Sequence, residues 1–111
     1  MKKFTIEDYE TLLNTYCEGE ECQFEIVSDK AYLELKEEDG KTLVTVWYKY
    51  RTIINDTFRL FTKNIDMVNL IEYKGYPVII INSLYSKYLY IFIDIDTESK
   101  DYLKLLALNN I

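Results

Sequence analysis

Two short apolar runs in the second half of the chain lack polar alternation. Residues 78–81 and 88–93 place β-branched, aromatic and leucine side chains on consecutive positions, and a polar link around residues 83–87 joins them. Successive side chains of a strand point to opposite faces, so both faces of these strands are apolar. The pattern predicts two neighbouring strands in the interior, with other elements covering them on both sides.

Two segments near the ends of the chain have helical periodicity and are candidates for that cover. Thr5 and Asp8 have the spacing of a capping box, which predicts a helix over residues 5–17. Its apolar face consists of Tyr9, Leu12, Leu13 and Tyr16. A second helix is predicted to begin at Thr97. Its inward side chains are expected to be Tyr102, Leu105, Leu106 and Leu108.

The segments between these elements alternate between apolar and polar positions, as half-buried strands do. Predicted strands cover residues 23–26, 31–36, 43–54 and 57–61, with a hairpin over 70–78. Residues 28–30 and 37–41 are interpreted as hairpin turns, and the second of these contains Asp39 and Gly40. Residues 62–69 fit either a short helix or a plain connection.

These elements predict an α+β fold: an antiparallel meander sheet of six or seven strands, with an N-terminal and a C-terminal helix packed on it. Hairpin-length links between successive strands favour the meander order. A chain of 111 residues fits one domain with one core. We therefore expect a single α+β domain over residues 1–111.

The side-chain inventory argues against catalysis. The chain has no histidine, which removes Ser–His–Asp and Cys–His pairs and histidine-based zinc sites. Its two cysteines, Cys17 and Cys22, are too few for a four-thiolate site, and the sequence leaves open whether they form a disulfide. We predict no enzyme activity, no catalytic residues, no metal and no cofactor.

The same sequence lacks the signals of a membrane or secreted protein. No apolar run approaches the roughly 20 residues that span a bilayer. The N-terminus turns acidic after two lysines instead of continuing into the apolar segment of a signal peptide. We predict a cytoplasmic protein that does not bind a membrane.

Acidic residues are concentrated in the first third of the chain. The first 39 residues hold twelve Asp and Glu against four lysines, and the net charge of the whole chain is −6. Such an excess suits a basic partner, although solubility alone also explains it. The acids expected to reach a partner lie in predicted loops: Glu18, Glu20, Glu21, Glu37, Glu38 and Asp39.

A mixed aromatic and basic surface is expected on the strands over 43–54 and 57–61. If Val44, Phe58 and Leu60 face the core, the opposite face carries Trp47, Lys49, Arg51, Arg59 and Phe61. Such a face could stack nucleic-acid bases, anchor a protein partner, or be an ordinary solvent face. Because the rest of the chain is acidic, direct nucleic-acid binding is disfavoured, and we assign the face to protein binding.

Asp94 and Asp96 follow the second apolar run and lie on the same side of a strand. Paired carboxylates at a strand end are a common way to hold Mg²⁺. Alternatively, the acids are solvated and Thr97 caps the helix that follows. A metal-dependent small-molecule activity at this pair is therefore one alternative function.

Together these features predict a non-enzymatic protein-binding module. An acidic surface can mimic nucleic acid and block the basic nucleic-acid-binding surface of a partner enzyme, as small inhibitors and immunity-type proteins do as a class. The chain holds eleven tyrosines and is rich in Ile, Lys and Asn, a bias frequent in low-GC bacteria and their phages. A homo-oligomeric module, such as a homodimer with exposed strands buried across a two-fold axis, is another alternative.

Overall fold

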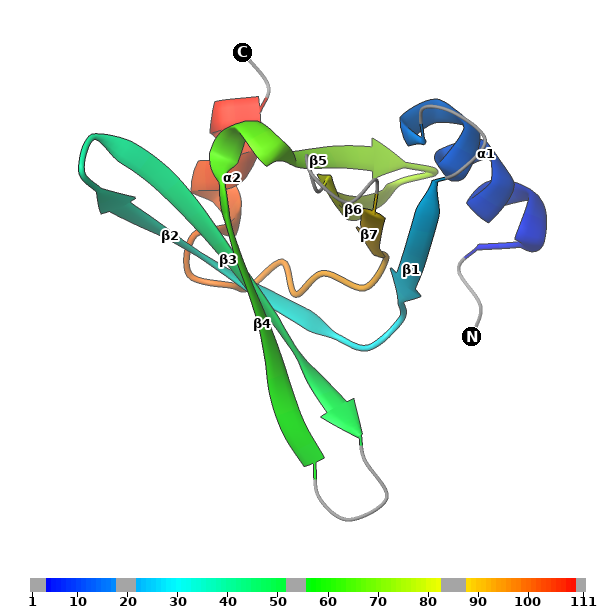
Figure 1. Ribbon diagram of the computed structural model, residues 1–111, viewed down its shortest axis with the longest axis horizontal. Helices are drawn as coiled ribbons and strands as arrows, with labels where there is room; N and C mark the ends of the chain where they lie inside the picture. Colours follow the sequence, from blue (N-terminus) through cyan, green and yellow to red (C-terminus); the bar gives the residue numbers. More distant parts are fainter. Residues whose placement is uncertain (1–3, 18–21, 52–55, 83–87, 110–111) are drawn as a thin grey trace.

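The computed structural model describes residues 4–17, 22–51, 56–82 and 88–109 (Figure 1). This part of the chain forms two α-helices, one short 3₁₀-helix and seven strands in two sheets. In chain order the elements are α1 (Ile6–Tyr16), β1 (Gln23–Val27), β2 (Ala31–Glu38), β3 (Lys41–Arg51), β4 (Asp56–Asn64), η1 (Ile65–Met67), β5 (Val68–Tyr73), β6 (Tyr76–Asn82), β7 (Tyr88–Phe92) and α2 (Tyr102–Asn109).

The strands form sheet A, in the order β1-β7-β6-β5, and sheet B, in the order β2-β3-β4. The α+β class is as predicted, but the single meander is wrong. β1 pairs with β7 in parallel, with Gln23 opposite Tyr88. Residues 28–30, predicted to form a hairpin turn, instead carry the chain from sheet A to sheet B. A parallel pair needs a long crossover between its strands, so no local turn signal reveals it.

Main-chain hydrogen bonds join the two sheets at one corner. Ile93, just after β7, donates its N–H to the carbonyl of Val27 at 3.1 Å. Ala31, the first residue of β2, donates its N–H to the carbonyl of Asp94 at 2.8 Å. The end of β7 therefore accompanies the end of β1 as both leave sheet A.

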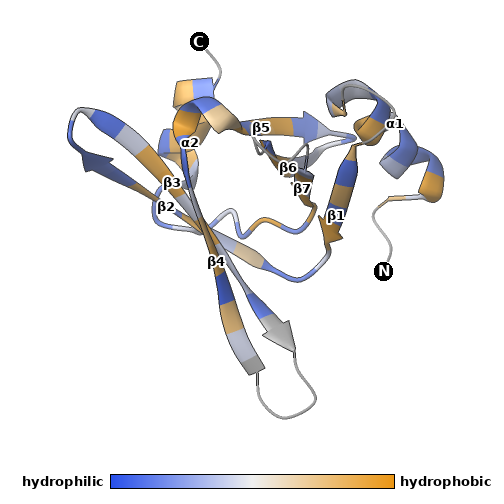
Figure 2. Cartoon of the chain, viewed as in Figure 1, coloured by the Kyte–Doolittle hydropathy of each residue, from blue (hydrophilic) through white to orange (hydrophobic). Residues whose placement is uncertain are grey.

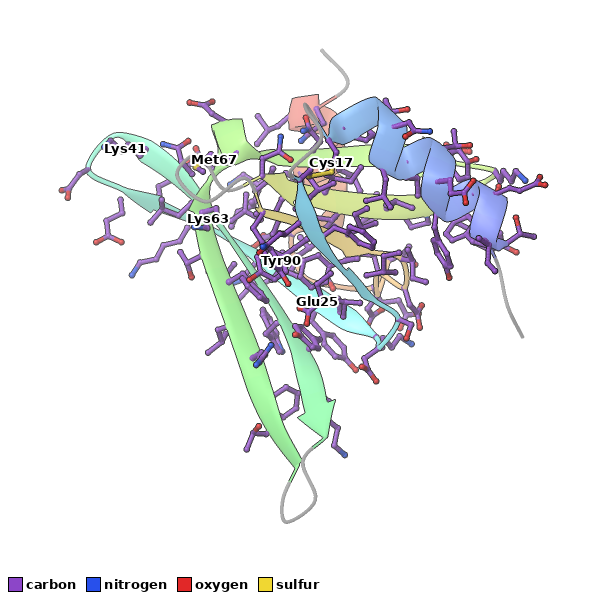
Figure 3. All side chains as sticks on the ribbon, turned by 45° about the vertical axis from the view of Figure 1, so that its right-hand side comes forward. Cys17, Glu25, Lys41, Lys63, Met67 and Tyr90 are labelled. Atoms are coloured by element: carbon purple, nitrogen blue, oxygen red, sulfur yellow. A yellow bond between two sulfur atoms is a disulfide. The ribbon has the colours of Figure 1, made fainter. Side chains whose placement is uncertain are left out.

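The two apolar runs form β6 and β7, which are adjacent and antiparallel as predicted, with Ile80 opposite Ile91. One face of sheet A packs against α1 (Figure 3), and that core layer contains Phe4, Leu12, Val78, Ile80, Leu89, Ile91 and Ile93. The opposite face packs against sheet B and α2, and that layer includes Leu33, Val44, Val46, Ile79, Ile81, Phe92 and Leu105. The cover on this second face comes from a sheet as well as a helix.

The first helix begins as its sequence predicts. Thr5 is the N-cap: its Oγ1 accepts from the N–H of Asp8 at 3.3 Å, and its own N–H donates to Asp8 Oδ2 at 2.8 Å. This is a capping box with Asp in place of the usual Glu. At the other end, a disulfide between Cys17 and Cys22 ties the end of α1 to the start of β1, with the two Cα atoms 5.7 Å apart.

The second helix begins at Tyr102, later than the predicted start at Thr97. Asp96 Oδ1 accepts from the N–H of Glu98 at 2.9 Å, which forms a local turn in place of the first helical turn. The helix buries Leu105 fully, whereas Leu108, predicted to face inward, is 40% exposed.

The ambiguous stretch over residues 62–69 contains two strand ends and a single 3₁₀ turn. β4 continues to Asn64, whose Oδ1 accepts from the N–H of Asp66 at 3.1 Å and caps η1. β5 then begins at Val68. Neither α-helix in the described part of the chain has the length and apolar character needed to span a bilayer.

Candidate functional site

Sheet B packs on the core with one face only. Trp47 in β3 lies opposite Tyr32 of β2 and Leu60 of β4, and directly opposite residues of neighbouring strands share a face. Figure 2 shows the resulting alternation of apolar and polar residues along β3 and β4. The face directed away from sheet A, termed the outer face, carries Tyr32, Glu34, Trp47, Lys49, Phe58 and Leu60.

The outer face exposes two large apolar side chains that were predicted to face the core. Phe58 is 60% exposed and Leu60 is 66% exposed. The prediction is wrong by one residue of register, because Phe61, not Leu60, lies opposite the buried Val46. A shift of one residue moves every side chain of a strand to the other face.

The predicted aromatic and basic surface is therefore divided between the two faces of sheet B. Trp47 and Lys49 lie on the outer face, whereas Arg59 and Phe61 lie on the face toward sheet A. Arg51 belongs to β3, but its side chain lies outside the described residues. These five residues do not form one surface.

On the inner face, Arg59 and Phe61 connect β4 to sheet A. Arg59 Nη1 lies 4.0 Å from Glu25 Oε1, and the ring centroid of Phe61 lies 4.4 Å from that of Tyr90. Glu25 and Tyr90 lie between β1 and the β3–β4 hairpin (Figure 3). Burial there raises the pKa of the Tyr90 hydroxyl above its ordinary value. This contact links the two sheets, with Arg59 and Glu25 partly exposed at its edge.

The described members of the predicted acidic set lie at the turn between β2 and β3. Glu37, Glu38 and Asp39 are all exposed. Thr42 donates its hydroxyl to Glu37 at 2.7 Å, and Lys36 Nζ lies 3.7 Å from Glu38 Oε2. Two of these three acids thus have partners within the turn. The remaining members lie outside the described residues: Glu18, Glu20 and Glu21.

A hollow opens beside two stacked rings of the outer face. The ring centroids of Tyr32 and Trp47 are 5.8 Å apart, with the ring planes inclined by 22°. The hollow has a volume of about 250 Å³ and is lined by Tyr32, Leu33, Glu34, Trp47, Asp96, Glu98, Ser99 and Lys100. We term it the β2 hollow, because it lies at the β2 edge of the sheet.

The lining of the β2 hollow suits a cation. Three carboxylates, from Glu34, Asp96 and Glu98, surround it against the single ammonium of Lys100. Aromatic ring faces attract cations, and a carboxylate forms short charge-assisted hydrogen bonds with a guanidinium or ammonium group. An arginine or lysine side chain could therefore lie on the rings and reach the acids.

The wall of the β2 hollow is anchored to the strand beside it. Ser99 Oγ accepts from the N–H of Leu33 at 3.2 Å, and Asp101 Oδ2 accepts from the N–H of Leu35 at 2.8 Å. These bonds place the turn before α2 against β2, so the carboxylates it carries are positioned by the fold.

Sequence reasoning missed Tyr32, Glu34 and Glu98. A signal for the first two was present, because Asp39 and Gly40 make a two-residue turn with Glu38 opposite Lys41. Counting back from that turn brings Tyr32 opposite Trp47. Glu98 had no such signal, because only the tertiary fold brings it to β2.

The surroundings of Asp8 hold the pKa of its carboxyl group well below the ordinary value. Lys74 Nζ lies 2.7 Å from Asp8 Oδ1, and together with the bond from the N–H of Thr5 it lowers the pKa of Asp8 to about 2. The Tyr73 hydroxyl also donates to Asp8, at 3.1 Å. These contacts attach the start of α1 to the β5–β6 turn, so the role of Asp8 is structural.

Asp94 and Asp96, the alternative metal site predicted from the sequence, follow β7 as expected. In residues 4–17, 22–51, 56–82 and 88–109, no three acidic or cysteine side chains lie close enough together to coordinate one metal ion. One oxygen of Asp96 accepts from the main chain of Glu98, as described above.

A second cleft, of about 490 Å³, lies between α2 and the β5–β6 hairpin. It is lined by Leu70, Ile71, Glu72, Gly75, Pro77, Tyr102, Leu106 and Asn109.

Comparison with models of known protein families, with curated proteins and with solved structures found no match for this chain.

Proposed function

We propose that this protein is a non-enzymatic protein-binding module that takes a basic side chain of its partner into the β2 hollow. The observation that supports this most strongly is the stack of Tyr32 and Trp47 beside the carboxylates of Glu34 and Glu98. Tyrosine, tryptophan and arginine are the residues most enriched at the centres of protein interfaces. Here the two aromatic rings are present, and the carboxylates beside them have the charge that attracts an arginine of a partner.

The physical argument depends on rigidity as well as charge. The rings lie on the central and edge strands of sheet B, and the acids of the opposite wall are held by the bonds to Leu33 and Leu35. A site already in its bound geometry loses little conformational entropy on binding. The net charge of −6 adds long-range attraction, which raises the association rate with a basic partner and is screened by salt.

In its finer form, the proposal is that the partner is a nucleic-acid-acting enzyme and that this protein covers its basic groove. The protein would then be a small cytoplasmic inhibitor or immunity-type protein of bacterial or phage origin. Glu37, Glu38 and Asp39 lie at the tip of the β2–β3 hairpin and could add weaker contacts at the rim. Rim charges change the association rate more than the affinity.

Trp47 is the single tryptophan of the chain and reports directly on the hollow. We expect a hexa-arginine peptide to change its fluorescence in a saturable way that weakens as salt rises. The double variant Glu34→Gln/Glu98→Gln should bind several-fold more weakly, since each exposed charge contact contributes about 0.2–1 kcal/mol. The matched control Glu37→Gln/Glu38→Gln, which removes the same charge from the tip of the β2–β3 hairpin, should weaken binding much less than the first double variant.

An unchanged fluorescence signal, or an equal loss in both double variants, would contradict the proposal. The finer form needs a further test: a purified nuclease or polymerase recovered with the protein should lose activity in its presence and regain it with Trp47→Ala. Direct nucleic-acid binding predicts instead a rise in anisotropy of a labelled single-stranded oligonucleotide on addition of this protein alone.

A further inference from the structure

The two edges of sheet B differ in how their main-chain groups are satisfied. At the β2 edge, Ala31, Leu33 and Leu35 donate their N–H groups away from β3. The acceptors are Asp94 O, Ser99 Oγ and Asp101 Oδ2, at 2.8, 3.2 and 2.8 Å. The segment before α2 thus closes this edge. An edge without such cover is a template for pairing with another strand.

The closed edge identifies which groups point outward at the other edge. In an antiparallel sheet the N–H and C=O of one residue point to the same side, and successive residues alternate. The main-chain N–H and C=O of Leu33 point away from β3, so those of its register partner Val46 point toward β4. There they are opposite Phe61 and bond to its main chain. The intervening residues of β4 therefore direct their main-chain groups to the open edge: Phe58, Leu60 and Thr62.

The open edge and the exposed apolar side chains coincide. Phe58 and Leu60 are the most exposed large apolar residues of sheet B, at 60% and 66%. Within the described ranges of the chain, no group hydrogen-bonds to their outward main-chain atoms. The same two residues of β4 therefore carry both exposed apolar side chains and main-chain groups that are free to pair with another strand.

We propose that two copies of this chain pair their β4 strands antiparallel about a two-fold axis at Leu60. The inference goes beyond the proposed function and does not depend on it, because the β2 hollow lies at the opposite edge of the sheet. Leu60 is the central residue of β4, which runs over Asp56–Asn64, so this register pairs the whole strand with itself. Phe58 then faces Thr62 of the second copy, and each of the outward residues exchanges hydrogen bonds.

Charge selects this register over its neighbours. Moving the axis to residue 59 places Arg59 directly opposite Arg59 of the second copy, and moving it to residue 61 places Arg59 opposite Lys63 of the second copy. Like charges directly opposite each other destabilise a strand pair. With the axis at Leu60, Arg59 faces Phe61 of the second copy instead.

The register also completes an apolar row across the sheet. Tyr32, Trp47 and Leu60 lie side by side across β2, β3 and β4. The two-fold axis continues this row into Leu60, Trp47 and Tyr32 of the second copy, on one six-stranded sheet. The two β2 hollows then open on the same face, five strand spacings or roughly 24 Å apart. A strand pair of this length is a small interface, so a micromolar dissociation constant is expected.

Light scattering after size exclusion tests the association. At tens of micromolar the unchanged protein should have twice the mass of one chain, and Leu60→Lys should be monomeric because it places like charges on the axis. Leu103→Lys is the matched control: Leu103 is 74% exposed on α2, and its substitution should leave the dimer intact. A monomeric unchanged protein, or equal dissociation by both variants, overturns the proposal.

Cysteine cross-linking tests the register and does not depend on the Leu60→Lys variant. Leu60→Cys should form an inter-copy disulfide under mild oxidation, because hydrogen-bonded partners have Cα atoms about 5.5 Å apart. Phe58→Cys alone should not, since its copies lie four residues apart along the strand, roughly 13 Å. A mixture of Phe58→Cys and Thr62→Cys chains should cross-link, as mass spectrometry of unreduced peptides will show. Cross-linking of Phe58→Cys alone at the rate of Leu60→Cys overturns the register.

Discussion

The two sheets of this protein show two ways of using apolar strands. Sheet A is covered on both faces, by α1 on one side and by sheet B with α2 on the other, and β6 buries four consecutive residues, 78–81. Sheet B buries every second residue and leaves its outer face in solvent. The difference teaches that sheet A contributes to the core with both faces, while sheet B contributes with its inner face and leaves its outer face free to contact other molecules.

The largest effect on the free energy of unfolding is expected when a truncation inside sheet A is compared with one on the outer face of sheet B. Ile80 is fully buried in sheet A, so Ile80→Ala should lower the free energy of unfolding by ~2–5 kcal/mol. Leu60→Ala, on the outer face of sheet B, should change it by less than about 0.5 kcal/mol in dilute protein. Urea denaturation followed by circular dichroism measures both values. Equal losses would show that the outer face of sheet B contributes to stability as the core does.

A smaller effect concerns the closed edge of sheet B. Asp101→Ala removes the acceptor of the Leu35 N–H and should cost ~1–3 kcal/mol. It should also loosen the wall of the β2 hollow, which hexa-arginine titration of Trp47 fluorescence would detect. Lys100→Ala, next along the same turn and exposed, is the control and should leave stability within about 0.5 kcal/mol. If Lys100→Ala loses as much stability as Asp101→Ala, the hydrogen bond to the Leu35 N–H is not the cause of the loss.

The attachment of α1 to sheet A should depend on pH. The folded-state pKa of Asp8, about 2, lies below its ordinary value of 3.8. The ionised carboxylate therefore stabilises the fold above about pH 4, and this contribution is lost as the pH falls from about 4 to about 2. We expect the Tm difference between the unchanged protein and Asp8→Asn to be full at pH 6 and to close toward pH 2. A difference that stays constant over that range would exclude this linkage.

The smallest effect is expected where the two sheets meet at the surface. Glu25 and Arg59 are 36% and 45% exposed, and their nearest charged atoms are 4.0 Å apart. An ion pair exposed to this degree contributes less than about 1 kcal/mol. Arg59→Gln should therefore lower the free energy of unfolding only within that limit, measured by urea denaturation at low salt. A loss near that of Ile80→Ala would show that this contact belongs to the core.

The elements that local patterns specify were predictable. The consecutive apolar residues of β6 and β7 indicated strands buried on both faces, and Thr5 with Asp8 indicated the start of α1. Each of these signals depends on neighbours in sequence. The turn at Asp39 and Gly40 belongs to the same class, because a tight hairpin fixes the register of the strands it joins.

The rest depended on contacts between distant residues. The orientation of β4 was misassigned because Phe58 and Leu60 were expected to face the core and Arg59 the opposite side, whereas Arg59 lies on the face toward sheet A near Glu25. The turn before α2 was expected to be helical. Its side chains instead accept hydrogen bonds from the main-chain N–H groups at the edge of β2. The candidate site was therefore half predicted: Trp47 was identified, but the wall that faces it was not.

The parallel pairing of β1 with β7 has a consequence for synthesis. β1 leaves the ribosome early, but the strand that it pairs with begins only at Tyr88. A growing chain therefore carries β1 without its partner until β7 has been made, and closing so long a loop slows folding. A polypeptide terminated before Tyr88 lacks the strand that joins β1 to β6, so sheet A is completed only after β7 has been made.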